Sequence, residues 1–139
     1  MKMDTISQPV VLRWFPGGQQ YEQALRATLA YDRKEPYEAR VLFPVGLEHL
    51  DLVLARDLLA NGLTGPATYG GIRVWPNHDE YWAVCIGWTA PTGQARVEAR
   101  ATAVAHFVNL TYYLVPQGTE PPRADIDTVI AALLNDGRR

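Results

Sequence analysis

The stretch ARDLLANGL, residues 55–63, decides how the middle of the chain folds. The residues before it, HLDLVL at 49–54, place a leucine at every second position, as a half-buried strand does. The stretch itself favours a short helix, which we expect Gly62 to end in the left-handed conformation that a Cβ would disfavour. Leu63 would then fold back on the helix as a hydrophobic contact. The segment is therefore predicted to be a strand followed by a capped helical turn.

Three further strands are candidates on the N-terminal side. Residues 10–14 alternate and stop at the turn sequence Pro-Gly-Gly at 16–18. Residues 37–43 also alternate, up to Pro44. Residues 21–31 fit a period of two, but they are rich in good helix formers, so the local pattern leaves strand and helix open.

On the C-terminal side, residues 72–75 are predicted to form a strand that a polar loop follows at 76–80. Residues 81–88 are apolar on both faces, and Trp82 shares one face with Val84, Ile86 and Trp88. Such a run indicates a central strand that is covered on both sides. The sequence Pro-Thr-Gly at 91–93 predicts a hairpin turn into a strand at 94–98.

Two helices are expected near the end of the chain. In residues 100–115, polar side chains form one narrow stripe, and apolar side chains fill over half of the circumference. Such a helix needs two apolar partners: one can be a sheet, and the other the last helix or a second protomer. The last helix is predicted at 125–135, with Asp125 as its cap. The fold class is therefore α+β, with antiparallel strands and helices packed on one side.

Composition limits the classes of function. The length of 139 residues fits one domain, 1–139, with a frayed N-terminus, and 47% hydrophobic and 20% charged residues are ordinary for a globular protein. The net charge of −2 argues against nucleic-acid binding, which requires basic side chains to neutralise phosphates. The eleven arginines are also scattered singly in the sequence, apart from Arg138-Arg139. Residues 1–10 lack the apolar core of a signal peptide, and no window reaches the about 18 apolar residues of a membrane span.

No catalytic, metal-binding or cofactor-binding residue is predicted, and the chain is not expected to be an enzyme. Cys85, the single cysteine, is expected to pack in the core, where burial raises the pKa of a thiol. His49, His78 and His106 show no metal-ligand spacing and are expected near the surface. The loop Asn-His-Asp-Glu at 77–80 has the most reactive composition, but a solvated hairpin tip explains it equally well.

Trp75 is the aromatic side chain that most suggests a surface role. It precedes Pro76 at a strand end and has the opposite parity to Ile72 and Val74. Aromatic residues anchor interfaces as well as cores, although core packing is the commoner role. We expect Trp75 to be partly exposed at a sheet edge or between protomers.

Several pieces of the chain, in order, resemble the SsgA-like proteins of sporulating actinomycetes. Besides the stretch at 55–63, these pieces are Tyr31-Asp32, Pro36-Tyr37, Val74-Trp75-Pro76, Val84-Cys85-Ile86, Pro91-Thr92-Gly93, VPQGTE at 115–120 and Asp125-Ile126-Asp127. The resemblance favours a strand at 21–31. It implies a Whirly-like fold, in which antiparallel sheets radiate like a pinwheel, and a homo-oligomer, a trimer.

The resemblance also implies a function. It implies a non-enzymatic scaffold of sporulation-specific cell division that helps position the tubulin-like protein FtsZ at septa. SsgA is the second implied partner, and the location is cytoplasmic, with the membrane reached only through partners. The alternative is single-stranded nucleic-acid binding, because Whirly-type folds in other lineages bind single strands and aromatic residues could stack on bases.

Four residues are candidates for partner binding. Arg56, Asp57 and Asn61 are the polar members of the central stretch, and Trp75 is the aromatic candidate. The alternative for the first three is that they only cap and solubilise a short helix.

Overall fold

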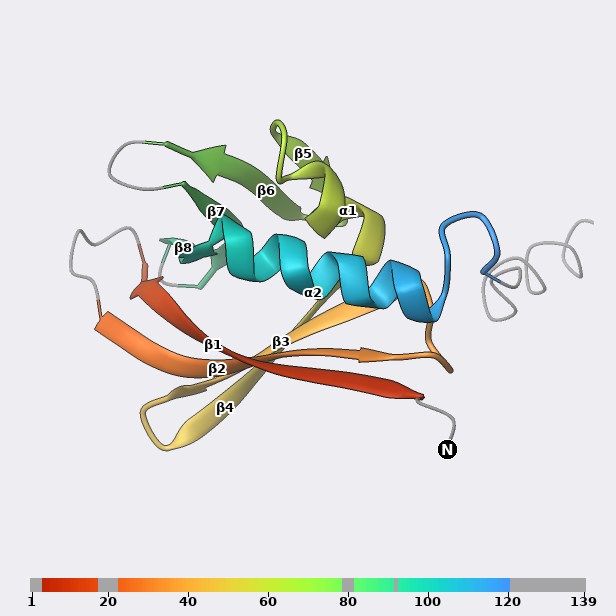
Figure 1. Ribbon diagram of the computed structural model, residues 1–139. Coiled ribbons are helices and arrows are strands. Elements are labelled where there is room, and N and C mark those ends of the chain that lie inside the picture. The colour runs from red at the N-terminus through yellow and green to blue at the C-terminus, as the bar shows by residue number, and fades with distance from the viewer. Residues whose placement is uncertain (1–3, 18–22, 79–81, 92, 121–139) are drawn as a thin grey trace, which may run out of the picture.

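The computed structural model describes residues 4–17, 23–78, 82–91 and 93–120 (Figure 1). The elements are β1 (Thr5–Phe15), β2 (Gln23–Asp32), β3 (Glu38–Val45), β4 (Glu48–Ala55), α1 (Arg56–Asn61), β5 (Ala67–Tyr69), β6 (Ile72–Asn77), β7 (Ala83–Ala90), β8 (Gly93–Arg100) and α2 (Ala101–Leu114). The antiparallel α+β class is therefore confirmed.

The strands form one antiparallel sheet in the order β4-β3-β2-β1-β8-β7-β6-β5. Two meanders, β1 to β4 and β5 to β8, meet where β1 pairs with β8. That junction runs only from Arg13 opposite Glu98 to Phe15 opposite Arg96, whereas β1 pairs with β2 from Thr5 to Trp14. The two halves of the sheet are thus joined by a narrow ladder and must be held together by their shared core.

The sheet is strongly curled around that core. Phe43 in β3 and Trp88 in β7 are four strands apart, which corresponds to roughly 19 Å in a flat sheet. Their ring centroids are only 6.5 Å apart, and the ring of Trp14 in β1 lies 5.5 Å from Phe43 and 5.9 Å from Trp88. The inner face therefore closes into a half-barrel.

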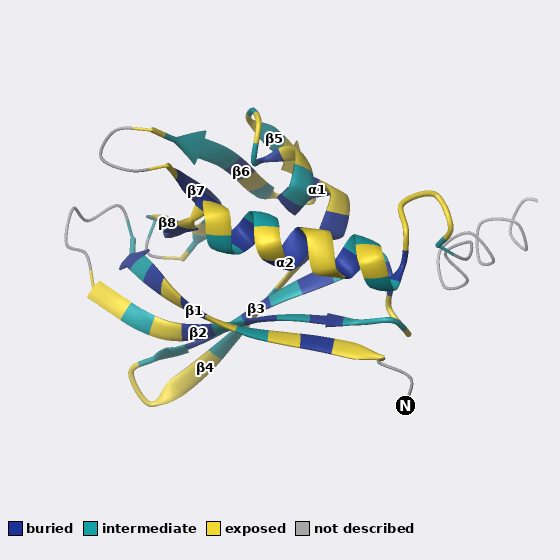
Figure 2. Ribbon diagram, in the orientation of Figure 1, coloured by how far each residue is buried: buried dark blue, intermediate teal, exposed yellow. Residues whose placement is uncertain are grey.

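Helix α2 crosses the inner face of the sheet, and α1 packs beside it (Figure 1). The expected polar stripe of α2 is exposed (Figure 2): Thr102, His106, Asn109 and Tyr113. The sheet is one apolar partner of α2, as predicted, and α1 is another. The last helix, predicted at 125–135, lies outside the described residues. Within the described ranges, no helix is long and apolar enough to cross a membrane.

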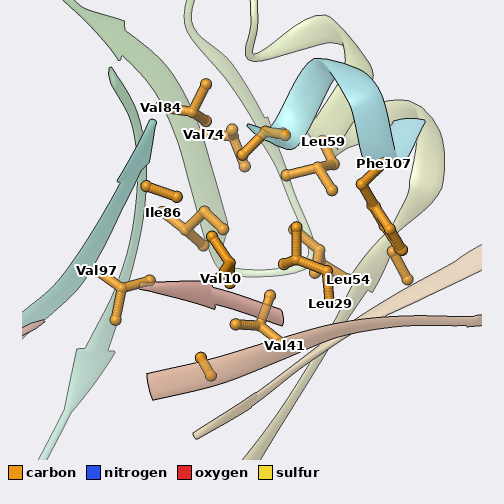
Figure 3. Close-up of a cluster of buried hydrophobic side chains, with 14 of the residues drawn as sticks. Val10, Leu29, Val41, Leu54, Leu59, Val74, Val84, Ile86, Val97 and Phe107 are labelled. Atoms are coloured by element: carbon orange, nitrogen blue, oxygen red, sulfur yellow. The ribbon is translucent and has the colours of Figure 1, made fainter. Parts of the chain in front are cut away.

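The core fills the space between the sheet and the two helices. Figure 3 shows side chains from both meanders and both helices converging there: Val10, Leu29, Val41, Leu54, Leu59, Val74, Val84, Ile86, Val97 and Phe107. Each fully buried side chain of this kind stabilises the fold by about 1.5–3 kcal/mol. This shared core joins the two halves that the short β1–β8 ladder leaves weakly connected.

The strands expected from alternation are confirmed within β1, β2, β3, β4, β6, β7 and β8. The preference for a strand at 21–31 is confirmed by β2, whereas β5 was not anticipated. β6 extends to Asn77, into the segment expected to be a loop. Trp82 also differs from the prediction, because β7 begins only at Ala83 and Trp82 precedes it. Its side chain is 43% exposed and stacks on His78.

Gly62 corrects the prediction of a left-handed helix cap. Its φ is −66°, which any residue adopts, so α1 ends without a left-handed residue. Glycine is required for space instead, because a Cβ at position 62 would lie 2.6 Å from the Cβ of Val74 and overlap the Cγ1 atom. The close approach of α1 to β6 therefore explains this glycine. Left-handed glycines occur at the β5–β6 hairpin, where Gly70 and Gly71 have φ values of 63° and 80°.

Candidate functional site

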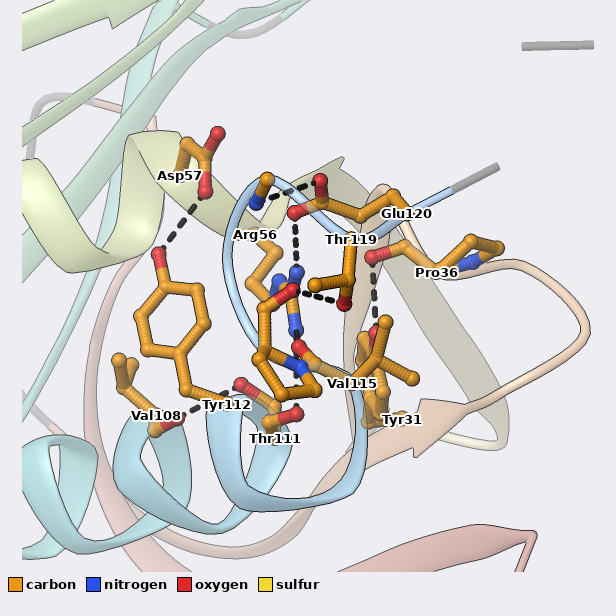
Figure 4. A network of polar contacts seen from close by, with 12 residues as sticks. Tyr31, Pro36, Arg56, Asp57, Val108, Thr111, Tyr112, Val115, Thr119 and Glu120 are labelled. Atoms are coloured by element: carbon orange, nitrogen blue, oxygen red, sulfur yellow. Dashed lines mark hydrogen bonds and ion pairs between the residues drawn. The ribbon is translucent and has the colours of Figure 1, made fainter. Parts of the chain in front are cut away.

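Arg56, the first residue of α1, is buried and only 1% exposed. The expectation that it is a polar surface residue is therefore wrong. Its backbone N–H donates to the carbonyl oxygen of Tyr37 at 2.8 Å, which fixes the junction between β4 and α1. The side chain points into the molecule toward the end of α2 (Figure 4).

The guanidinium of Arg56 binds the C-terminal end of α2 and the segment that follows. Nη1 donates to the carbonyl oxygens of Thr111 at 3.0 Å and Val115 at 2.6 Å. Nη2 donates to Oε1 of Glu120 at 2.5 Å. Carbonyl groups at a helix C-terminus carry partial negative charge, so a buried cation is stabilised there, although the Thr111 oxygen also accepts from the backbone N–H of Val115. One side chain of α1 thus clamps the end of α2.

Two tyrosine rings flank the same guanidinium. Its carbon Cζ lies 4.4 Å from the ring centroid of Tyr112 and 5.2 Å from that of Tyr31, within the range of cation–π attraction. The hydroxyl of Tyr112 donates to Oδ1 of Asp57, and that of Tyr31 donates to the carbonyl oxygen of Pro36, both at 2.8 Å. Each ring is therefore fixed by a hydrogen bond at its far end.

Glu120 completes this group, which we call the Arg56 cluster: Arg56, Tyr31, Asp57, Tyr112 and Glu120. Burial raises the pKa of Glu120, but hydrogen bonds from the backbone and from Arg56 outweigh that effect and hold the pKa below its ordinary value. Burial raises the pKa of both tyrosines, and the bond to Asp57 raises that of Tyr112 further. At neutral pH Glu120 is therefore ionised, and the hydroxyls of Tyr31 and Tyr112 are protonated and act as hydrogen-bond donors.

The Arg56 cluster is an internal anchor. Among the described residues, Nε is the atom of Arg56 that has no hydrogen-bond partner. The other polar groups of the cluster bind one another or nearby backbone, which fixes the end of α2 and the segment up to Glu120 against α1 and β2. Arg56, from the central stretch, thus makes the junction between α1 and the end of α2 rigid.

Asp57 and Asn61 are the members of the central stretch that reach the surface. Both are exposed, and their spacing of four residues places them on one face of α1. On α2, Leu110 is 36% exposed and Tyr113 is 88% exposed. Leu110 belongs to the broad apolar part of α2, and it is exposed because no neighbouring element in the described part of the chain extends over it.

Trp75 is partly exposed, as expected, but β6 is not an edge strand because β5 pairs with it. The indole lies on the face of the sheet opposite to α2, where a Cβ at Gly87 would be 3.0 Å from its ring. It therefore lies on the other side of the sheet from Asp57 and Asn61. The structure does not bring the four candidate residues into one site.

The remaining candidates behave as surface or packing residues. Cys85 is buried, and burial together with the Glu98 carboxylate raises its pKa to about 12, which confirms the packing role. His49, His78 and His106 are exposed, as predicted. No group of three or more His, Cys, Asp and Glu side chains that could hold a metal ion occurs among the described residues. Asp79 and Glu80, from the loop with the most reactive composition, lie outside those residues.

The chain is similar to known proteins over most of its length. Residues 25–120 match the family model described as Streptomyces sporulation and cell division protein, SsgA. The sporulation-specific cell division protein SsgB of Streptomyces coelicolor is 40% identical over 110 residues, covering 78% of this chain and 80% of that protein. SsgB of Frankia casuarinae is 32% identical over 140 residues, covering 99% and 96%.

Two solved structures share the fold. The first is described with the words "Mutations in SsgB correlate to longitudinal cell division during sporulation of Streptomyces coelicolor". It has a TM-score of 0.75 at 37% identity, covering 84% of this chain and 92% of that one. An SsgA-like sporulation-specific cell division protein from Thermobifida fusca has a TM-score of 0.78 at 34% identity, covering 95% and 98%. The sequence prediction of an SsgA-like protein similar to SsgB is thereby confirmed, and the chain belongs to the SsgA family of sporulation and cell division proteins.

Proposed function

We propose that this chain is a non-enzymatic scaffold of sporulation-specific cell division that helps position FtsZ at septa. The observation that carries the proposal is membership of a family whose relatives are named for sporulation-specific cell division and for no enzymatic reaction. A rigid body is what a recruitment factor needs, and the Arg56 cluster supplies rigidity where α1 meets α2.

The assembly belongs to the same proposal. A homotrimer of chains with the Whirly-like fold, in which antiparallel sheets radiate like a pinwheel, would present each docking residue three times. A polymer such as FtsZ repeats its own surface, so three weak contacts would act together through effective concentration. SsgA is the second proposed partner, and the chain would act in the cytoplasm, reaching septal membrane only through its partners.

Asp57 and Asn61 are the proposed contact residues for FtsZ. They are exposed on one face of a helix that the Arg56 cluster holds in place. Because the two positions are fixed before binding, little conformational entropy is lost when a partner docks. Arg56 would act through the position of α1, since its guanidinium is buried.

The experiment is light scattering and pelleting of assembled FtsZ with the purified chain. We expect the chain to pellet with the polymer, and Asp57→Lys to weaken binding by at least about tenfold because it reverses the charge at the centre of the contact. The matched control is Glu48→Lys, which makes the same change of charge at the exposed start of β4.

The outcomes separate the two levels of the proposal. Absence of association between FtsZ and the wild-type chain would contradict the function itself. Association that Asp57→Lys and Glu48→Lys leave equally strong would contradict only the assignment to Asp57. Circular dichroism melts of each variant check that the loss of the Tyr112–Asp57 bond has not unfolded the chain.

A further inference from the structure

The face of the sheet opposite to α2 carries a group of arginines that are far apart in the sequence. The strand register aligns two rows across β1, β8, β7 and β6. One row is Arg13, Glu98, Cys85 and Trp75, and the other is Phe15, Arg96, Gly87 and Arg73. Three arginines that appear isolated in the sequence therefore share one surface, which corrects the inference that no basic cluster exists.

Each of these arginines lies over an aromatic ring. Cζ of Arg96 is 3.9 Å and Cζ of Arg13 is 5.8 Å from the ring centroid of Phe15. Cζ of Arg73 is 4.8 Å from the ring centroid of Trp75. Stacking on rings holds the guanidinium planes in place, so less rotamer entropy is lost when they bind a ligand. We call Arg13, Arg73, Arg96, Phe15 and Trp75 the arginine–aromatic patch.

The patch keeps a positive charge after its internal pairing. Glu98, which is 4% exposed, lies 3.3 Å from Nε of Arg96 and 3.7 Å from Nη1 of Arg13. One carboxylate thus serves two guanidinium groups. Arg73 is exposed and forms no ion pair within the described ranges, and the side chain of Arg96 remains 42% exposed. Because the whole chain has a net charge of −2, this positive surface makes the charge distribution uneven, which can orient a charged partner.

We infer that the arginine–aromatic patch binds an acidic peptide segment of a partner protein. Guanidinium groups match carboxylates with two parallel hydrogen bonds, and the aromatic rings between them supply apolar contact. Single-stranded nucleic acid fits less well, because base stacking requires open rings and Phe15 is only 6% exposed beneath Arg96. This inference does not depend on FtsZ, and the patch lies on the opposite side of the sheet from α1.

The experiment is a fluorescence-anisotropy titration of the full chain with a fluorescein-labelled peptide of aspartate and glutamate residues. We expect saturable binding that weakens as salt is raised, because exposed charges are screened. Arg73→Glu should weaken it by at least about tenfold, equal to about 1.4 kcal/mol. Arg96→Gln, which keeps a polar side chain beside Glu98, should give a smaller loss of a few-fold.

Lys34→Glu is the matched control, since it makes the same change of charge at the exposed turn after β2, about 33 Å along the strands from Phe15. Thermal melts confirm that each variant is folded. Absence of saturable binding, or equal weakening by Lys34→Glu and Arg73→Glu, would overturn the inference. So would tighter, Arg73-dependent binding of a labelled oligothymidylate, which would assign the patch to nucleic acid.

Discussion

Arg56 and Arg73 carry the same guanidinium group, and the fold gives them opposite situations. Arg56 is 1% exposed and binds two backbone carbonyls and a carboxylate, whereas Arg73 is exposed and lies over a single ring. A buried charge must be paired and hydrogen-bonded, because its desolvation is otherwise unfavourable by several kcal/mol. The difference teaches that Arg56 holds the structure together, while Arg73 is available to another molecule.

The largest expected effect comes from Arg56→Met, which keeps the volume of the side chain and removes its charge. The carbonyl of Val115 would lose its partner, and the carboxylate of Glu120 would lose its charged partner but keep its bond from the backbone N–H of Gly118. We expect the free energy of unfolding to fall by about 3 kcal/mol, measured by urea denaturation. The comparison fails if Arg73→Met lowers it equally, since that exposed residue is expected to change it by less than about 0.5 kcal/mol.

Gly62→Ala should have the next largest effect. The backbone at Gly62 suits alanine, but the new Cβ would overlap the side chain of Val74. We expect a loss of about 1–3 kcal/mol in the free energy of unfolding, as is typical of overpacking. Val74→Ala removes the overlapping Cγ1 methyl group but keeps the Cβ, so it should relieve part of the overlap and make the double variant more stable than the sum of the two single losses predicts. Additive losses would contradict the steric explanation.

The Glu120 carboxylate gives the clamp a pH dependence. Its folded pKa lies below the unfolded value of about 4.5, so its contribution is present above pH 4.5 and is lost as the pH falls through the folded pKa. Glu120→Gln should lower the free energy of unfolding by about 1–2 kcal/mol at neutral pH. Urea denaturation at neutral and acidic pH should show the difference from wild type shrinking on acidification. A difference that grows on acidification would have the wrong sign.

The last prediction concerns the chemical reactivity of the Cys85 thiol and involves no change in stability. Burial and the neighbouring Glu98 raise its pKa to about 12, so almost no thiolate exists near neutral pH. We expect the thiol to resist a disulfide reagent in the native chain and to react at once in denaturing urea, measured by absorbance of the released thiolate. Equal rates in the two conditions would show that this part of the outer face opens readily.

Local patterns in the sequence predict the strands and α2 well, because alternation and helical periodicity are set by neighbouring residues. The leucines of β4 face inward, and the polar stripe of α2 is exposed, as periodicity indicates. Gly62 was misassigned because its reason for being glycine is Val74, a residue on another element. The preference for a left-handed glycine at a helix end depends only on local sequence, so it cannot predict a contact with another element.

The candidate site could be predicted only in part, for the same physical reason. Asp57 and Asn61 are exposed, but Arg56 is buried because the end of α2, more than fifty residues later, supplies its acceptors. The arginine–aromatic patch was missed because Arg13, Arg73 and Arg96 become neighbours only through strand register. Once the order β1-β8-β7-β6 is known, the alternation within each strand is sufficient to find it.

The most direct test of the contrast between the two kinds of arginine is hydrogen exchange of the arginine side chains by NMR in the unmodified chain. We predict that the Nη protons of Arg56 exchange with water about 100-fold more slowly than those of Arg73 and Arg96, because a buried, hydrogen-bonded group must open before it exchanges. Equal rates at Arg56 and Arg73 would contradict the account.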